Sequence, residues 1–409
     1  MVKQIELMFS RGLARVMHID INSCFATIEQ QANPMLRGKP VVVAAYTTDS
    51  GCILTASVEA KKRYGIKTGM RVSEGKKLCP RLIVLPSDPP KYRFVHHEIK
   101  KILKDYSPEV VPKSIDEFVL KFDEGWTQIN QIEVGKEIKR RIRNEVGEWI
   151  SVSIGFGPNR FLAKTAAGLT KPDGLEIIDQ NNYLKIYEKL ELMDLCGINR
   201  ANDARLKSRG IYSVIDFLNA SVPQLRSAFG SIAAVYWHQR LRGHEVDEVE
   251  FGRASFGHSY SLPKPYKEKA DLWPLITRLT CKATRRMRLD GYKARTISIG
   301  ISYRDGGQFA ARKTLKRATN NDEVVLRNME EIFEQRRVDE VRLLAISLVN
   351  LEKSSLDQDF LFEDYNKIKN LNGAIDSINS RWGDSCLVRA SAIKEAGVIL
   401  DRISFGSVR

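Results

Sequence analysis

Two adjacent acidic residues stand inside an otherwise apolar stretch between residues 110 and 122, and they limit what this segment can form. Asp116 and Glu117 are followed by Phe118, after which apolar and polar side chains alternate as in a half-buried strand. Neighbouring side chains on a strand point to opposite faces, so two acids can reach one site only where the strand bends. We therefore expect a hairpin tip here, where a carboxylate pair suits a hard cation that prefers oxygen ligands. The alternative is an ordinary solvated turn, in which Asp is common.

A third acid, near the N-terminus, favours the functional interpretation. Asp20 interrupts a short apolar strand that runs from about Val16 to Ile21. A carboxylate in such a strand is costly unless it is paired or bound to a metal. The residues after Ser23 have a helical pattern, so Asp20 lies where a strand passes into a helix. The N-terminus of such a helix offers N–H groups to phosphate.

Two further segments carry basic residues beside turns. The helix predicted from Val58 to Tyr64 contains three consecutive basic residues at 61–63, which either face a phosphate or form a solvated surface. Gly157-Pro158-Asn159 opens a second helix, which bears Lys164. A Pro-Asp-Gly turn at 172–174 closes that helix. The spacing differs from that of a Walker A loop, so this segment is not a nucleotide loop of that kind.

The charge of the chain is uneven. The 409 residues have a formal net charge of +15, and the segment from Arg253 to Arg317 contains 16 Lys or Arg but only 4 Asp or Glu. This excess of 12 in about a sixth of the chain indicates a region that holds a polyanion.

Other features exclude several classes of protein. No run approaches the ~20 apolar residues that a membrane helix needs, and the start of the chain is too polar for a signal peptide, so we expect a cytoplasmic protein. The six cysteines contain no C-x-x-C pair and predict neither a zinc site nor a disulfide framework. His96-His97 is expected on a helix surface.

The second half of the chain divides into two patterns. From about 180 to 245 the pattern is that of short helices. Two turns in this region, Cys196-Gly197-Ile198-Asn199 and Arg209-Gly210-Ile211, have a spacing that resembles a helix-hairpin-helix. Such a motif binds a DNA phosphate through backbone N–H groups. A plain pair of helix caps is the alternative.

The pattern of residues 250–352 predicts the order β-α-β-β-α-β, which is typical of a small α+β domain. The first helix of this domain has one apolar face and one basic face. Its apolar face contains Leu272, Leu275, Leu279, Ala283 and Met287.

The tail after Lys353 is polar and resembles a linker. It contains Gln358-Asp359-Phe360-Leu361-Phe362 beside acids. One amphipathic helix is expected after this peptide, from the spacing of Ile368, Leu371, Ile375 and Ile378.

Three motifs stand in an order and spacing that resemble one family. Asp20 lies in H-I-D-I-N-S-C-F-A, Asp116 and Glu117 lie in S-I-D-E, and Lys164 ends S-I-G-F-G-P-N-R-F-L-A-K. Each motif alone is weak, but together they resemble a Y-family DNA polymerase, the translesion class, with the DNA polymerase IV type the most similar. The resemblance covers residues from about 14 to 352.

The resemblance implies an α+β fold, the right-hand polymerase with a palm, small fingers, a helical thumb and a β-α-β-β-α-β little finger. The implied parts are an N-terminal extension at 1–13, the palm at 14–29 and 87–178, the fingers at 30–86, the thumb with its helix-hairpin-helix at 179–245, the little finger at 246–352 and the tail at 353–409.

The resemblance also implies the chemistry. We expect template-directed synthesis of low processivity, which transfers a nucleotide from dNTP to a primer 3′-OH with two Mg²⁺ ions and without a proofreading exonuclease. Asp20, Asp116 and Glu117 are the implied catalytic metal ligands, with the Ile21 carbonyl as an additional ligand. Three acids suffice as ligands, so no general base of shifted pKa is needed.

Further residues have implied roles around the nucleotide. Phe25 is the implied steric gate beneath the incoming sugar, and a core aromatic is the alternative. Thr55, Lys61 and Lys164 are expected near the triphosphate. Lys61 replaces a usual Arg and its helix holds an extra residue, so Lys62 or Arg63 fits the same role.

The implied partners are primer–template DNA, dNTP and a sliding clamp, with no membrane and a monomeric state. The candidate DNA-binding residues are Gly197, Ile198, Arg278, Lys282, Arg285, Arg312 and Lys313. The candidate clamp-binding peptide contains Gln358, Leu361 and Phe362, and an aromatic pair that covers the tail helix is its alternative.

Three other interpretations stay open at this level. The chain could be a DNA-binding scaffold with an inactive palm, the catalytic subunit of a polymerase V type complex, or a two-metal nucleotidyl cyclase with a similar palm. The intact set of three acids argues against the scaffold, and the DNA-gripping segments argue against the cyclase.

Overall fold

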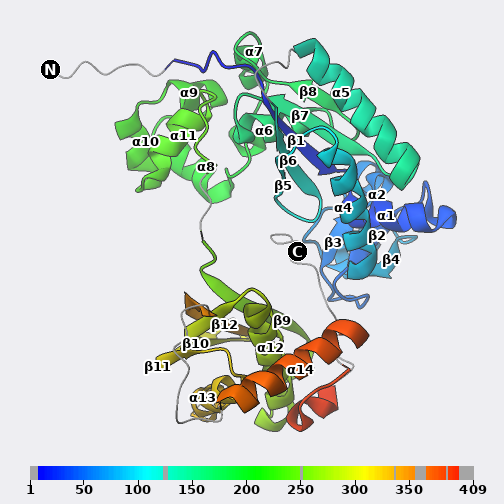
Figure 1. Cartoon of the computed structure of the whole chain (residues 1–409). Helices are drawn as coiled ribbons and strands as arrows, with labels where there is room; N and C mark the ends of the chain where they lie inside the picture. The colour runs from blue at the N-terminus through cyan, green and yellow to red at the C-terminus, as the bar shows by residue number, and fades with distance from the viewer. Residues whose placement is uncertain are drawn as a thin grey trace. The chain divides into compact units, whose positions relative to one another are not determined.

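The computed structural model describes residues 8–122, 128–248, 252–335, 338–354, 365–383 and 386–395 (Figure 1). The chain divides into two compact units, one formed by the described residues up to 248 and the other by those from 252 onward. Within the described residues, no helix is long and apolar enough to cross a membrane.

A five-stranded sheet with the order β5-β6-β1-β7-β8 forms the centre of the first unit. Its strands are β1 (Val16–Ile21), β5 (Val110–Pro112), β6 (Glu117–Lys121), β7 (Val152–Gly157) and β8 (Leu175–Ile177). β1 is antiparallel to both β6 and β7, whereas β7 is parallel to β8. The strand that carries Asp20 is therefore the middle strand, and it lies directly beside the hairpin of the acid pair (Figure 1). Both the strand and the hairpin were predicted from the sequence.

Alternation along β1 divides its side chains between two faces of the sheet. Ile19 and its odd-numbered neighbours lie in the main hydrophobic core with residues of α4 and α5. Val16 lies on the other face and packs with Ala163 of α6. His18 and Asp20 have the same parity as Val16, so they share the face that α6 covers. The helices around this sheet are α1 (Cys24–Ala32), α4 (Pro89–Lys104), α5 (Gln128–Arg141) with the π-helical turn η2 (Ile142–Val146), and α6 (Arg160–Leu169).

Helix α6 lies unusually close to β7. A Cβ added at Gly155 would stand 2.2 Å from the carbonyl oxygen of Ala163 and 2.1 Å from the nitrogen of Ala167. Only glycine allows this approach. The helix begins at the predicted turn, where Asn159 Oδ1 accepts from the N–H of Leu162 at 2.7 Å.

A three-stranded sheet with the order β3-β2-β4 has its own small core. Its elements are η1 (Pro34–Leu36), β2 (Val41–Ala44), β3 (Ile53–Ala56), α2 (Val58–Tyr64), α3 (Val72–Leu78) and β4 (Ile83–Pro86). Helix α2 has the predicted bounds because both ends are capped. Ser57 Oγ accepts from the N–H of Ala60 at 3.2 Å, and Gly65 ends the helix with a left-handed φ of 66°.

Short helices form the rest of the first unit, as predicted. They are α7 (Tyr183–Tyr187), η3 (Leu192–Asp194), α8 (Arg200–Lys207), α9 (Val214–Asn219), α10 (Val222–Phe229) and α11 (Ala233–Arg240). Residues 8–10, which we call the N-terminal strap, run against them. The Phe9 ring stacks on Tyr183 with 3.9 Å between centroids, and the Ser10 N–H donates to the Arg242 carbonyl at 2.7 Å.

The second unit has the predicted order β-α-β-β-α-β and contains an antiparallel sheet with the order β11-β10-β12-β9. Its elements are β9 (Ser255–Tyr266), α12 (Lys269–Leu289), β10 (Tyr292–Tyr303), β11 (Gln308–Thr319), α13 (Asp322–Glu334) and β12 (Val341–Lys353). The five apolar residues predicted on one face of α12 are all buried. The α+β class predicted for the chain is therefore confirmed.

The tail does not behave as a simple linker. Helix α14 (Tyr365–Trp382), which was predicted, belongs to the second unit and packs beside α12, and the turn η5 (Ala390–Glu395) follows it. Arg288 of α12 makes two hydrogen bonds to the Asp376 carboxylate, at 2.7 and 2.9 Å. The candidate clamp-binding peptide at 358–362 lies outside the described residues.

Candidate active site

The middle strand and the hairpin bring two of the three acids together. Asp20 is directly opposite Glu117 in the register between β1 and β6. A ligand atom from each of these residues and from His18 lies within 4.8 Å of the other two. This juxtaposition follows from alternation, because Asp20, His18 and Glu117 all point to the face of the sheet that α6 covers.

Asp116 occupies the turn before β6. Its carbonyl accepts from the N–H of Ile21 at 2.9 Å, and its Oδ1 accepts from Ser114 Oγ at 2.5 Å. The backbone of the turn also contacts a histidine, because His96 Nδ1 lies 3.0 Å from the Ile115 carbonyl. These bonds fix the acid pair at the bend that the sequence predicted.

Two lysines provide the positive charge nearest to these acids. Lys164 of α6 donates to both carboxylate oxygens of Glu117, at 2.8 and 2.9 Å. Lys171, in the loop between α6 and β8, has its Nζ 2.7 Å from Asp20 Oδ2. Each lysine thus pairs with a different acid.

The three acids differ in how well their charges are compensated. Burial raises the pKa of Asp20 although Lys171 opposes the shift, and burial also raises the pKa of Asp116 although the Ser114 hydrogen bond opposes it. Burial also acts to raise the pKa of Glu117, but the hydrogen bond from Lys164 and the charges of the neighbouring basic groups together outweigh it, so the net shift is downward. Asp20 and Asp116 are therefore the carboxylates that gain most from an added cation.

His18 is the fourth titratable group of the site. It is 2% exposed, and burial lowers its pKa to about 3, so the imidazole is neutral at physiological pH. Its Nε2 lies 4.0 Å from Glu117 Oε1. Neither ring nitrogen has a hydrogen-bond partner among the described residues.

A cavity of about 460 Å³ opens beside the acids. It lies between the end of β1, the start of α1, the β3–α2 segment and the loop at 171–172. Its lining residues are Asp20, Ile21, Asn22, Ser23, Cys24, Leu54, Thr55, Val58, Lys61, Lys62, Thr68, Asp116, Lys171 and Pro172. Two acids and three lysines in one lining suit a ligand that carries both a metal ion and phosphates.

Several residues predicted near a triphosphate line this cavity. Thr55, Lys61 and Lys62 do so, whereas Arg63 and Lys164 are not among the described lining residues. Lys61 Nζ donates to Ser23 Oγ at 2.9 Å, and burial, reinforced by the positive charge of Lys171, lowers its pKa.

Phe25 lies in the hydrophobic core. It is 1% exposed and stacks on Tyr92 with 4.3 Å between ring centroids. Cys24, the residue before it, lines the cavity. The placement agrees with the core-aromatic alternative, and the steric-gate role stays a prediction.

The candidate DNA-binding residues fall into different environments. Gly197 has a left-handed φ of 98° before α8, and Ile198 is buried among the short helices. Arg278, Lys282 and Arg285 do not lie on an open face, because all three line a pocket between α12 and α14 and none is without a partner. Their DNA-binding role stays a prediction that this placement does not support.

The two candidates on β11 point to opposite faces of the second unit's sheet. Arg312 is exposed, whereas Lys313 pairs with Glu331 of α13. Both were predicted to bind DNA, but adjacent residues on a strand cannot share a face. Lys316 has the parity of Arg312 and is also exposed.

Sequence reasoning missed three residues around the site. Lys171, which precedes the predicted turn at 172–174, was not singled out, and His18 was noted only as part of a strand. The expectation that His96 lies on a helix surface was wrong, because it is 1% exposed and stacks on Phe118. The spacing of Lys171 from the helix end gave no signal, since its contact with Asp20 depends on how the loop folds back.

Comparisons with known proteins agree with this geometry. Residues 19–168 match the model of the impB/mucB/samB family, and residues 253–360 match that of the impB/mucB/samB family C-terminal domain. A DNA polymerase IV from Moorella thermoacetica is 32% identical over 399 residues, which cover 93% of this chain and 96% of that protein. A DNA polymerase IV from Pelotomaculum thermopropionicum is 34% identical, with 94% and 96% covered.

Solved structures give the same result. A Y-family DNA polymerase chimera, Dbh-Dpo4(243-245)-Dbh, is 27% identical with a TM-score of 0.70, and an insertion ternary complex of Dbh DNA polymerase is 26% identical with a TM-score of 0.59. Each match covers 82% of this chain and 98% of the other. The chain belongs to the Y-family DNA polymerases. Within that family it is of the DNA polymerase IV type, a DNA-directed DNA polymerase of the translesion class, as the motifs predicted.

Proposed function

We propose that this chain copies primed DNA templates, with low processivity and without proofreading, by transferring nucleotides from dNTP to the primer 3′-OH. The observation that carries the proposal is that Asp20 lies beside Glu117 and shares with Asp116 a cavity that is also lined by lysines. The neighbour described as an insertion ternary complex supports DNA and an incoming nucleotide as the ligands.

We further propose two Mg²⁺ ions at the three acids. The donor set fits, because it consists of carboxylates with the Ile21 carbonyl nearby, and because Asp20 and Asp116 are partly buried acids with raised pKa values. When bound, such ions stabilise negative charge on the attacking and leaving oxygens of an in-line displacement. The protein holds the ligands in place through the turn bonds of Asp116 and the strand register of Asp20.

The lysines are proposed to bind the phosphates. Lys61 and Lys171 line the cavity, and their ammonium groups would neutralise charge on the departing pyrophosphate. Lys164 is proposed to hold Glu117 in position, since both of its described hydrogen bonds go to that carboxylate. Phe25 is proposed to limit the space for a ribose 2′-OH through the position of α1.

The DNA duplex is proposed to lie against two surfaces. In the first unit, Gly197 lies in the turn before α8, and the N-terminus of that helix suits a phosphate. In the second unit, the sheet face that carries Arg312 and Lys316 is basic and exposed. Clamp binding through 358–362, a monomeric state and a cytoplasmic location stay predictions.

Primer extension by the purified chain tests the proposal. We expect Asp116→Asn to lower the extension rate by at least about a hundredfold, because a ligand of the reacting centre loses its charge. Chelation of divalent ions should abolish extension by the wild-type chain.

The matched control is Glu133→Gln, which removes an exposed carboxylate of α5 that pairs only with Lys136 among the described contacts. Full activity of Asp116→Asn would contradict the proposed role of the acids. A wild-type chain that binds DNA in a salt-sensitive way but extends no primer would instead support a scaffold, and extension only with added subunits would support a polymerase V type complex.

A further inference from the structure

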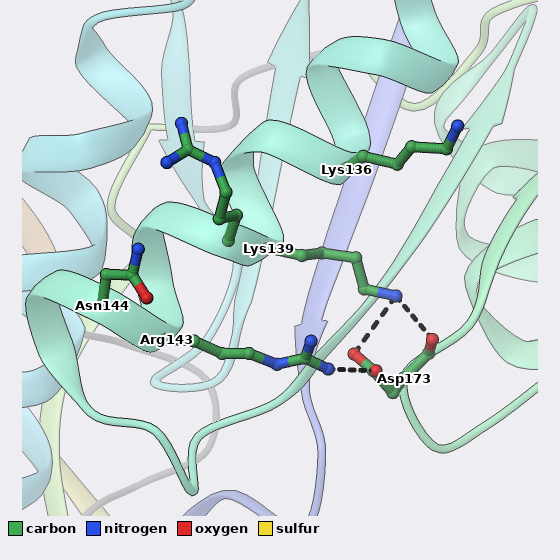
Figure 2. A pocket seen from close by; sticks show the side chains of 6 residues that line it. Lys136, Lys139, Arg143, Asn144 and Asp173 are labelled. Atoms are coloured by element: carbon green, nitrogen blue, oxygen red, sulfur yellow. Dashed lines mark hydrogen bonds and ion pairs between the residues drawn. The ribbon is translucent and has the colours of Figure 1, made fainter.

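The loop that contains Lys171 lines the cavity with one end, and its other end contacts the basic residues of α5 and η2. Lys171 and Pro172 line the cavity, and Asp173 immediately after them lies among the basic residues of α5 and η2 (Figure 2). Figure 2 shows Lys139 and Arg143 pointing at Asp173, whereas Lys136 points away from it.

Two cations hold Asp173 from this side. Arg143 donates to Oδ2 of the carboxylate, and Lys139 Nζ lies 3.1 Å from Oδ1 (Figure 2). Lys139 also donates to the carbonyls of Asp173 and Gly174, at 2.5 and 3.1 Å. The lysine side chain is only 12% exposed, so its ammonium is committed to this loop.

The backbone of the loop is tied to the middle of the sheet. The Asp173 N–H donates to Asn22 Oδ1 at 2.7 Å, and the Gly174 N–H donates to Ser153 Oγ at 3.3 Å. Asn22 also donates to Ser153 at 2.8 Å, so the four residues form one network next to β1. Asp173 itself has a left-handed φ of 63°, which an L-residue rarely adopts without support.

We propose that Asp173 is a positioning residue, which acts through Lys171 on the incoming nucleotide. Its contacts with Lys139 and Arg143 hold the loop so that the Lys171 ammonium stays beside Asp20. Only Pro172 separates Lys171 from Asp173, and the proline ring restricts the backbone angle φ between them. A displacement of Asp173 therefore also displaces Lys171. The proposal rests on the proposed polymerase function, because it assigns Lys171 to the nucleotide phosphates.

The substitution that tests this is Asp173→Asn. Asparagine adopts the left-handed conformation readily and has the shape of aspartate, so the variant removes the charge and little else. We expect the KM for dNTP to rise roughly threefold to tenfold with a smaller change in kcat, since a partly exposed ion pair contributes modestly. Arg143→Gln should change KM in the same direction.

A double-variant cycle separates positioning from a general loss of structure. If Asp173 acts through Lys171, then Asp173→Asn should have no further effect on KM when Lys171→Ala is already present. Lys136→Gln is the control, because Lys136 lines the same pocket and makes its described ion pair with Glu133. Its KM should equal that of the wild type.

Three results are distinguishable. A wild-type chain without primer extension would reject the proposed function. An active wild type with the same KM in Asp173→Asn and Arg143→Gln would reject the positioning role alone. An equal increase of KM in the presence and absence of Lys171→Ala would also reject it, because the effect would not pass through Lys171.

Discussion

A buried histidine supports the turn that carries the acid pair. His96 of α4 lies 3.0 Å from the Ile115 carbonyl, and because a carbonyl only accepts, Nδ1 must carry the proton. Its ring stacks on Phe118, the residue after the acids. Burial lowers the pKa of His96, so the folded protein holds it neutral. One side chain thus connects the core to the position of Asp116.

This predicts a pH dependence of stability that His96→Asn should reduce. Below the ordinary pKa of 6.5 the unfolded chain binds a proton that the folded chain does not, so the free energy of unfolding falls as the pH falls. The steepest contribution is about 1.4 kcal/mol per pH unit. Asparagine can donate to the same carbonyl but does not titrate.

The measurement is denaturant unfolding of both proteins at pH 7.5 and pH 5. The loss of stability between the two values should be larger for the wild type. Equal losses in the two proteins would show that His96 does not contribute.

The residues of the site differ in how far sequence could predict them. Asp20, Asp116 and Glu117 were found because an acid in an apolar strand is costly and therefore conspicuous. Lys171 and His96 were not found, because a lysine in a turn and a histidine on a helix can occupy many positions that have no role in a site. Their contacts depend on tertiary structure that no local pattern specifies.

At the scale of elements, α14 is joined to its unit by a buried ion pair as well as by apolar side chains. Its pattern predicted an amphipathic helix with an apolar face, and the helix is present. Asp376 is nevertheless buried at Arg288, whereas Leu371 and Ile378 are 58% and 40% exposed. Arg288, which also pairs with Asp322, requires carboxylate partners inside the unit. The periodicity predicted the helix, but it gave no sign that a buried ion pair lies beside Leu371 and Ile375 on the side that faces α12.

Asp376→Ala should therefore loosen α14. Arg288 would keep Asp322 but lose its bidentate partner, and we expect a loss of up to about 3 kcal/mol in the free energy of unfolding of the second unit. Hydrogen exchange should show faster exchange across residues 365–382. Glu330→Ala, at an exposed position of α13, is the control. Unchanged protection of α14 would mean that the ion pair does not anchor it.

At the scale of the whole molecule, each unit has its own hydrophobic core. The second unit's core contains residues from 256 to 348, and none of them belongs to the cores of the first unit. The order of elements in both units was predictable because their hydrophobic periodicities are strong. The association of α14 with the second unit was not, since it depends on contacts between distant segments.

Separate cores predict two transitions in calorimetry of the full chain. A mixture of Mg²⁺ and dNTP should raise the midpoint of only one of them, the one that includes β1 and β6, because a ligand stabilises the part that binds it. Asp20→Asn should remove most of that increase. A single transition that shifts as a whole would show that the units unfold together.

The N-terminal strap has a consequence for synthesis of the chain. Phe9 and Ser10 are translated well before their partners, which include Tyr183 and Arg242. At roughly 5 to 20 residues per second, the intervening stretch of about 230 residues takes on the order of 10 to 50 seconds to translate. During that interval the strap lacks part of its binding place, so its contacts are among the last of the first unit to form.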